Sequence, residues 1–305
     1  QRVWRIAWPA ILSNISIPLL GLVDAAILGH LESPVYLGAV AIGASILSFL
    51  YWGFSFLRMG TTGLVAKAFG ARDEQRQMLV LAQSVVLALL LALIVVAFHP
   101  LWLGLGLALM DPGPTIEPLA QSYTFIRIYS APAVLVTYAV VGCFIGRQNT
   151  RWPMVIVVTT NVINIGLDFL FIVGFGLNSD GAALATLVAE YCGCALALVA
   201  VWHNLRLQIS SELLVVLRRW SAYRELMRSN KNLFLRTVCL LFSFAFFTAQ
   251  SAKLGESQLA ANSIMLNLLL LAAYAMDGFA FAVEALTGEA IGARRMEDFR
   301  AAVRA

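Results

Sequence analysis

Long apolar stretches separated by short polar ones dominate the pattern along the chain. A helix needs about 20 apolar residues to cross the hydrocarbon core of a bilayer. Eight stretches reach that length, at about 4–28, 37–66, 79–103, 119–146, 152–176, 181–202, 232–252 and 259–288. The longest polar segment, 203–231, separates the sixth stretch from the seventh. The pattern therefore predicts an all-α polytopic membrane protein.

The composition supports this class. Hydrophobic residues make up 60% of the chain, charged residues only 12%, and the mean hydropathy is +0.82. The formal net charge is +4, but in a membrane protein a basic excess is typical of cytoplasmic loops, so no nucleic-acid partner is expected. The four cysteines lie inside apolar stretches and the three histidines are far apart in sequence. Neither a disulfide framework nor a metal site built on His and Cys is expected.

Lysine and arginine gather on one side of the predicted spans. The opposite loops, 29–36, 104–118, 177–180 and 253–258, contain a single lysine, Lys253. Because the bias of Lys and Arg sets orientation, we expect the N-terminus in the cytoplasm. The basic residues on that side are Arg2, Arg5, Arg72, Arg76, Arg147, Arg151, those of the segment 203–231, Arg294, Arg295, Arg300 and Arg304.

Part of the chain is repeated. Residues 37–73 align without gaps with residues 259–295 at a constant offset of 222, and the copies end in "LVAKAFGARD" and "LTGEAIGARR". Each copy follows an even-numbered span, so both cross the membrane in the same direction. Parallel repeats are related by an axis along the membrane normal and place a substrate site at their interface.

The repeat also predicts the domain organisation. We expect residues 1–205 to form an N-terminal six-helix lobe, 206–231 a cytoplasmic basic linker, and 232–305 the first two helices of a second lobe. Two copies of 222 residues would give about 444, so this second lobe is expected to be truncated by four helices. A natural eight-helix protein is the alternative.

Carboxyl groups inside the spans are candidate functional residues, because a charge in the middle of a bilayer is costly. Asp24 lies near the outer end of the first span, and Asp168 lies at a similar depth in the fifth. Three further polar side chains reach this depth, so a single cluster is predicted. Its other members are Asn164, Thr186 and Tyr123.

The chemistry of such a cluster is proton or sodium exchange. Two neighbouring carboxylates that lack water repel each other, so one of the pair is expected to hold a proton near neutral pH. Release of that proton, or its replacement by Na⁺, would rearrange the hydrogen bonds of the first span. Alternatively, Asp24 and Asp168 only join helices by hydrogen bonding. Pro9 and Pro18 each remove a backbone hydrogen bond from the first span, which predicts either a hinge or a kink used for packing.

The last span carries a second acidic pair. Asp277 and Glu284 are spaced i, i+7 on one helical face, whereas Ser55 and Thr62 occupy the aligned positions in the second span. They are candidates for a substrate or second-lobe site, with helix packing as the alternative. Three other ionisable residues inside spans are candidate buried partners: Arg58, Arg127 and Glu190.

Several motifs resemble the MATE family of multidrug and toxic compound extrusion transporters, and within it the DinF subfamily. They are "LVDAAILGHL", "GLVAKAFGARD", "NVINIGLDF", "GAALATLVAEY" and "AYAMDGFAFAVEALTGEAIGAR". The resemblance implies a twelve-helix fold of two six-helix lobes and export of organic cations in exchange for H⁺ or Na⁺. It also implies that Asp24 is the essential acid, with Asn164, Asp168, Thr186 and Tyr123 around it, and that the first span bends at Pro9.

The expected function is therefore secondary active antiport. A monomer in the bacterial inner membrane would contact lipids and expel amphipathic, often cationic drugs in exchange for H⁺, with no other cofactor. Na⁺ coupling at Asp24 and Asp168 is the nearest alternative, and a flippase for a lipid-linked precursor is another. An enzyme is not expected, because neither a DDxxD nor an HExxH motif is present.

Overall fold

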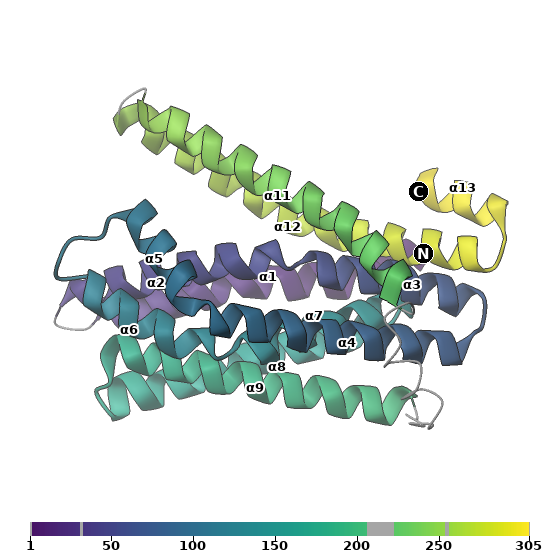
Figure 1. Ribbon diagram of the computed structural model, residues 1–305, viewed down its shortest axis with the longest axis horizontal. Helices are drawn as coiled ribbons and strands as arrows, with labels where there is room; N and C mark the ends of the chain where they lie inside the picture. Colours follow the sequence, from purple (N-terminus) through teal and green to yellow (C-terminus); the bar gives the residue numbers. More distant parts are fainter. Residues whose placement is uncertain (1, 31–32, 206–222, 254–255, 305) are drawn as a thin grey trace.

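The computed structural model describes residues 2–30, 33–205, 223–253 and 256–304 (Figure 1). These residues form helices joined by short turns, without any strand among them, as the apolar pattern predicted. The N-terminal helices are α1 (Arg2–Gly29), α2 (Pro34–Gly53), α3 (Phe56–Gly70), α4 (Glu74–Ala97), α5 (His99–Met110), α6 (Glu117–Ile128) and α7 (Ala131–Gly146). They are followed by α8 (Arg151–Asp168), the π-helix η1 (Phe169–Gly174), α9 (Asn178–Leu205), α11 (Arg224–Lys253), α12 (Glu256–Gly292) and α13 (Met296–Arg304).

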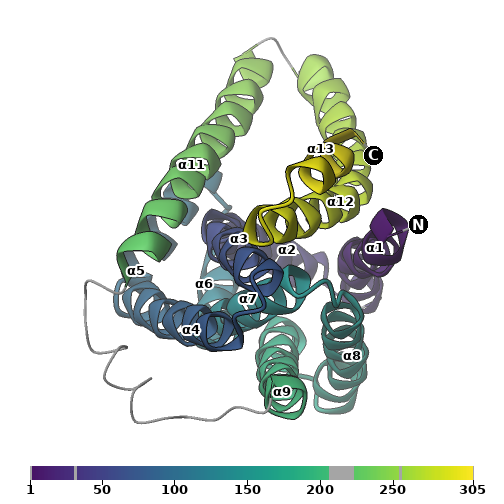
Figure 2. The ribbon, with the colours of Figure 1, turned by 90° about the vertical axis from the view of Figure 1, so that its right-hand side faces the viewer.

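The long helices run side by side along the long axis of the molecule, and both ends of the chain lie at the same end of the bundle (Figure 1). We call this the N-terminal end. Viewed along the axis, α3, α7 and α12 lie between α1 on one side and α4 on the other (Figure 2). The pair α11–α12 leans away from the other helices toward the opposite end and approaches them at the N-terminal end (Figure 1).

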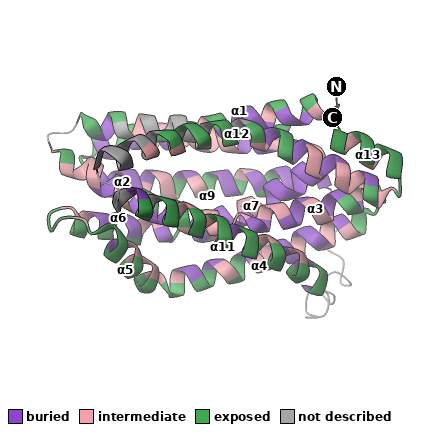
Figure 3. Cartoon of the chain, turned by 90° about the horizontal axis from the view of Figure 1, so that it is seen from above, coloured by how far each residue is buried: buried purple, intermediate pink, exposed green. Residues whose placement is uncertain are grey.

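Burial follows this arrangement. Purple, buried positions line the contacts between helices, and green, exposed positions mark the outer faces (Figure 3). The main core lies among α1 to α9, where Leu47, Leu57, Leu135 and Phe144 are almost fully buried. Exposed leucines and phenylalanines such as Leu93 and Phe242 cover the outside, which suits a lipid-facing surface.

Five segments among the described residues are long and apolar enough to cross a membrane. The pair α6–α7 makes a sixth if its two helices, bent by 51°, count as one span. The other two predicted stretches are also helical, as α1 and α11, but lie outside this set. The five segments are Pro34–Gly70, Glu74–Ala97, Arg151–Gly174, Asn178–Leu205 and Leu268–Gly292.

Three predicted spans contain breaks that the apolar pattern did not reveal. The stretch 37–66 is divided at Phe54–Ser55, 79–103 at Phe98, and 119–146 at Tyr129–Ser130. In the last two cases a proline, Pro100 or Pro132, lies in the first turn of the following helix. Proline lacks a backbone N–H and suits a first turn, so it starts a new helix within an apolar run.

The helix bounds repeat at the offset found in the sequence. The segment Pro34–Gly70, which holds α2 and α3, and helix α12, Glu256–Gly292, are both 37 residues long and begin and end 222 residues apart. Helices α1 and α11 begin at Arg2 and Arg224, and α4 and α13 begin at Glu74 and Met296, again 222 apart. The two copies thus share helix boundaries as well as sequence.

The predicted linker differs from the structure at its C-terminal end. Residues 206–222 lie outside the described part of the chain. Residues 224–231 belong to α11, which therefore begins eight residues before the predicted start of the seventh span at 232. The polar and basic residues of this stretch hid the first two turns of the helix, because an apolar pattern detects only the part that could lie in lipid.

Candidate functional site

Two acidic side chains meet in the interior of the N-terminal helices. Asp24 of α1 and Asp168 of α8 lie within hydrogen-bonding distance of each other. Asp168 is fully buried. Asp24 Oδ1 and both carboxyl oxygens of Asp168 have no hydrogen-bond donor among the described residues. Because a carboxylate can only accept, the two groups hydrogen-bond to each other only when one of them carries a proton.

The backbone changes its form next to this pair. Asp168 is the last residue of α8, and the chain continues directly into the π-helix η1. A π segment widens the helix and shifts the register of the residues after it, and such segments are frequent at functional sites. The apolar sequence Phe169–Gly174 gave no sign of the change.

The polar face of α8 connects two neighbouring helices. The Asn161 side-chain amide donates to the backbone oxygen and the hydroxyl of Ser16 in α1, at 3.2 and 3.0 Å. Asn164, which is buried, donates to the Thr186 hydroxyl of α9 at 3.2 Å, while its own Oδ1 has no partner among the described residues. The i, i+3, i+7 spacing thus places Asn161, Asn164 and Asp168 between α1 and α9.

Tyr123 reaches the same region from α6. It is 4% exposed and lies close enough to Asp24 and Asp168 to interact with them electrostatically. Its ring packs against Gly43 of α2, where a Cβ atom would collide with Cδ1 of the ring. The missing side chain of Gly43 therefore gives Tyr123 its place beside the two carboxyl groups.

An arginine also faces the cluster. Arg127, in the last turn of α6, interacts electrostatically with Asp24, Tyr123, Tyr51 and Glu190. Its Nε and Nη1 atoms are buried without a hydrogen-bond acceptor among the described residues. The sequence indicated that Arg127 and Glu190 need partners but did not assign them to this site.

The break between α6 and α7 lies just after Arg127. The Tyr51 hydroxyl of α2 lies 3.3 Å from the Arg127 backbone oxygen and 3.1 Å from the Ser130 hydroxyl. These contacts fix the bend at the point where the backbone carbonyls of α6 lose their helical partners. Tyr51 was not among the predicted site residues; its only signal is a polar group inside an apolar stretch.

The proposed hinge residues lie in an unbroken helix. Helix α1 runs continuously from Arg2 to Gly29 and includes Pro9 and Pro18. Pro9 is partly buried, whereas the side chain of Pro18 lies outside the described set. Movement of α1 at either proline stays a prediction.

The second acidic pair lies at the interface between the repeats. Asp277 and Glu284 of α12 both interact electrostatically with Arg58 of α3 and Arg236 of α11. The Arg58 guanidinium lies over the ring of Phe281, 4.2 Å from its centroid. The two acids thus share one face of α12 with Phe281 and have cations from both repeats nearby.

Comparison with known proteins identifies the family. The family model described as MatE matches residues 9–170 and 233–305. DNA damage-inducible protein F of Escherichia coli is 41% identical over 96% of this chain and 64% of its own length. A probable multidrug resistance protein NorM of Thermotoga maritima is 25% identical over 98% of this chain and 65% of its own.

Solved structures share the fold. An outward-facing MATE family transporter of the MOP superfamily has a TM-score of 0.87 at 22% identity, over 99% of this chain and 67% of that one. The chain spans just under two thirds of the length of the two relatives above. The family match covers most of the chain, and the E. coli protein is similar across nearly all of it. The chain therefore belongs to the MatE family, the MATE transporters that its motifs resemble.

Proposed function

We propose that this integral membrane protein is a secondary active multidrug efflux antiporter that exports amphipathic organic cations in exchange for H⁺. The observation that carries the proposal is the contact between Asp24 and Asp168 inside the helical bundle. Two carboxyl groups on different helices can share one proton or lose it. The choice between these states changes how α1 and α8 attract each other.

The exchange follows from this electrostatic coupling. With a shared proton, the pair carries one negative charge and its members attract each other through a hydrogen bond. Without it, two carboxylates repel each other in a region poor in water. Binding of a proton and binding of an organic cation thus favour different arrangements of α1, which is the differential binding that a transport cycle requires.

Arg127 favours H⁺ over Na⁺ in this proposal. Its guanidinium is a fixed positive charge beside Asp24 and has two buried N–H groups without acceptors. Its charge disfavours the binding of H⁺ and of Na⁺ alike, but Na⁺ also needs several oxygen ligands arranged around it beside the guanidinium. A proton instead becomes part of a neutral carboxyl group.

Sodium coupling is the second candidate. Oxygen atoms without hydrogen-bond donors converge from α1 and α8: Asp24 Oδ1, Asn164 Oδ1 and both carboxyl oxygens of Asp168. Thr186 bonds to Asn164 and would complete an oxygen-rich site. Such a donor set suits a hard cation.

We propose Asp277 and Glu284 as contacts for the positive charge of the exported compound. Both lie on the face of α12 that meets Arg58, and Phe281 between them adds an aromatic surface. Acidic and aromatic side chains together favour lipophilic cations. The same acids disfavour the pyrophosphate of a lipid-linked precursor, so a flippase is the weaker alternative.

The proposed setting is a bacterial inner membrane with the N-terminal end in the cytoplasm. The basic residues of the turns after α3, α7 and α12 all lie at this end, which agrees with the positive-inside rule. We expect a monomer in contact with lipids. A second lobe completed by chain beyond residue 305 stays part of the proposal.

Transport by the full-length protein in proteoliposomes tests the function. Vesicles loaded with a fluorescent organic cation receive either a pH gradient or a Na⁺ gradient. We expect efflux driven by the pH gradient in the wild type and none above background in Asp24→Asn. Efflux driven only by Na⁺ would keep the site and change the ion. Unimpaired pH-driven efflux by Asp24→Asn would contradict the proposal.

A further inference from the structure

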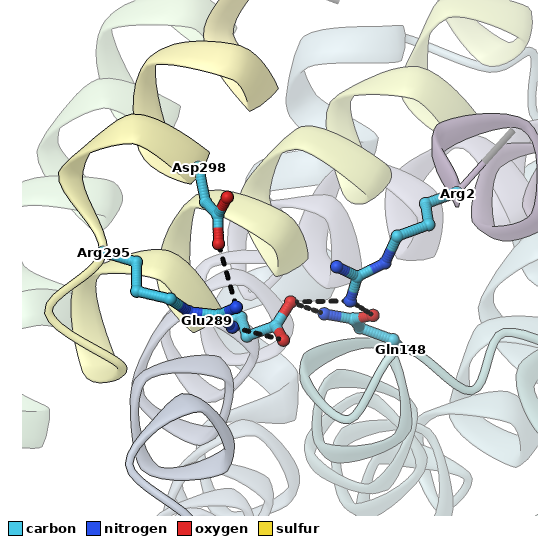
Figure 4. A network of polar contacts seen from close by, with 5 residues as sticks. All are labelled: Arg2, Gln148, Glu289, Arg295 and Asp298. Atoms are coloured by element: carbon cyan, nitrogen blue, oxygen red, sulfur yellow. Dashed lines mark hydrogen bonds and ion pairs between the residues drawn. The ribbon is translucent and has the colours of Figure 1, made fainter.

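Glu289 is the centre of a charged network at the N-terminal end of the bundle (Figure 4). Its carboxylate accepts hydrogen bonds from Arg2 at 2.9 Å, Gln148 at 2.6 Å and Arg295 at 3.4 Å. Arg295 also pairs with Asp298 at 3.0 Å. The network therefore ties the end of α12 to the start of α1 and to the turn between α7 and α8.

A second charged cluster lies at the same end. Glu225, in the first turn of α11, pairs with Lys67 near the end of α3 at 3.4 Å and with Arg76 in α4. The cluster borders a cavity of about 270 Å³ between α3, α4 and α11. It ties the start of α11 to the helices of the first repeat.

The two clusters are equivalent under the internal repeat. Lys67 and Glu289 are 222 residues apart, and Glu225 is one residue past the equivalent of Arg2. In each cluster, the start of the first helix of one repeat binds the end of the second helix of the other. The charges are reversed: Arg2 meets Glu289, whereas Glu225 meets Lys67.

The reversal favours pairing of these four residues across the interface between the repeats. Within the first repeat, Arg2 and Lys67 are both positive, and within the second, Glu225 and Glu289 are both negative. Like charges disfavour contact within one repeat, and opposite charges favour contact across the interface. The charges of these four residues therefore favour the pairing of the two repeats.

Close backbone contacts lie between the two clusters. A Cβ atom at Gly70 would collide with the backbone oxygen of Glu289, and one at Gly292 with the backbone oxygen of Lys67. Gly70 and Gly292 are again 222 residues apart, so each repeat presents the same glycine to the same position of the other. The repeats are in van der Waals contact here, while α11 and α12 lean away toward the opposite end (Figure 1).

We infer that the clusters around Glu289 and Glu225 are a pair of ionic locks that hold the repeats together at the N-terminal end. Both locks open when this end becomes accessible during transport. The inference rests on the proposed function, because alternating access requires an end that closes and opens. Glu289, whose side chain is 15% exposed, is the stronger lock, because shielding from water strengthens its ion pairs.

Distance measurements test the locks independently of transport. Arg72 and Arg294 are exposed, lie in the turns after α3 and α12, and are 222 residues apart. Spin labels on Arg72→Cys and Arg294→Cys report the separation of the repeats by double electron–electron resonance. The full-length protein first has its native cysteines, among them Cys143, Cys192, Cys194 and Cys239, changed to Ala.

We expect one short distance in this reporter protein and an added longer one when a lock is broken. Glu289→Gln should raise the population of the longer distance about tenfold. It removes two ion pairs, each of which shifts the equilibrium between the closed and the open arrangement by up to several-fold. Lys67→Glu should also raise this population, and the exchange Lys67→Glu with Glu225→Lys should lower it again in part, because the pair between positions 67 and 225 is restored while Arg76 still loses its partner. The matched control is Glu297→Gln, because Glu297 makes no ion pair with a described residue and should leave the distances unchanged.

Two results would overturn the inference. One is an unchanged distance distribution in Glu289→Gln. The other is a population of the longer distance that is as high in the protein with exchanged charges as in Lys67→Glu. Efflux assays on the same proteins separate the two proposals. A reporter protein that shows the expected distances but transports no organic cation would refute the proposed function and keep the locks.

Discussion

At the scale of single residues, the pair Asp24 and Asp168 has carboxyl oxygens that lack hydrogen-bond donors among the described residues. Asp168 is fully buried, and neither of its carboxyl oxygens receives a hydrogen bond from a described residue. Buried polar groups are nearly always satisfied in folded proteins. Its neighbour Asp24 offers a hydrogen bond only with a proton between them, so the unsatisfied atoms support the proposed proton site.

The sequence predicted part of this cluster. The depth of Asp24 and Asp168 in their spans and the i, i+3, i+7 pattern of α8 were sufficient to group Asp24, Asn164 and Asp168. Arg127 and Tyr51 were not assigned, because their contribution depends on the bend between α6 and α7 and on the rotation of α2. The depth of a residue in its span follows from counting residues, whereas the rotation of a helix about its axis depends on how it packs against its neighbours.

Arg127 gives the first prediction. Arg127→Gln removes a fixed positive charge beside Asp24, so Na⁺ should bind at the cluster at least about tenfold more tightly. Na⁺ gradients should then begin to drive efflux in proteoliposomes. Arg127→Lys keeps the charge and is the matched control. Equal Na⁺ dependence in the wild type and Arg127→Gln would show that Arg127 does not select the ion.

At the scale of helices, the repeat was the most informative feature of the sequence. It predicted equivalent segments, and the structure shows helix bounds at the same offset of 222 for Pro34–Gly70 and Glu256–Gly292. The repeat did not predict that the first copy is broken at Phe54–Ser55 while α12 is continuous. It also did not predict the π-helix after Asp168, since no residue type marks one.

Glycines at the crossing of α3 and α12 give the second prediction. Gly292→Ala places a methyl group against the Lys67 backbone, which cannot rotate away, so the free energy of unfolding should fall by about 1–3 kcal/mol. The thermal unfolding midpoint in detergent measures this change. Gly29→Ala, at the end of α1 with no atom within 4 Å of the added carbon, is the control. Equal effects of the two substitutions would contradict the close packing of the repeats.

At the scale of the whole molecule, basic residues and the acidic pair lie toward different ends of the helical bundle. The basic turns lie at the N-terminal end of the bundle, where the repeats meet. Asp24 and Asp168 lie near the C-terminal ends of α1 and α8, toward the other end of the bundle. If the basic turns face the cytoplasm, as proposed, the ionic locks lie on the cytoplasmic side of the membrane and the proton site lies toward the other side. The cytoplasmic position of this end is predicted from Lys and Arg alone and stays a prediction.

Labelling of single cysteines tests the direction. In a cysteine-free background, Asp111→Cys lies in the turn after α5 and Arg72→Cys in the turn after α3, at opposite ends of the bundle. A membrane-impermeant maleimide should label position 111 in intact bacterial cells and position 72 only after permeabilisation. The reverse pattern would place the N-terminus outside.

Proton exchange at Asp24 and Asp168 can be measured as the release of protons when a lipophilic cation binds. Full-length protein in weakly buffered detergent solution is mixed with tetraphenylphosphonium, and a pH indicator records released protons while equilibrium dialysis records binding. We expect about one proton per bound cation from the wild type and none from Asp24→Asn, because the shared proton of the carboxyl pair is then missing. Equal release from an Asp24→Asn protein that still binds the cation would contradict proton exchange at Asp24 and Asp168.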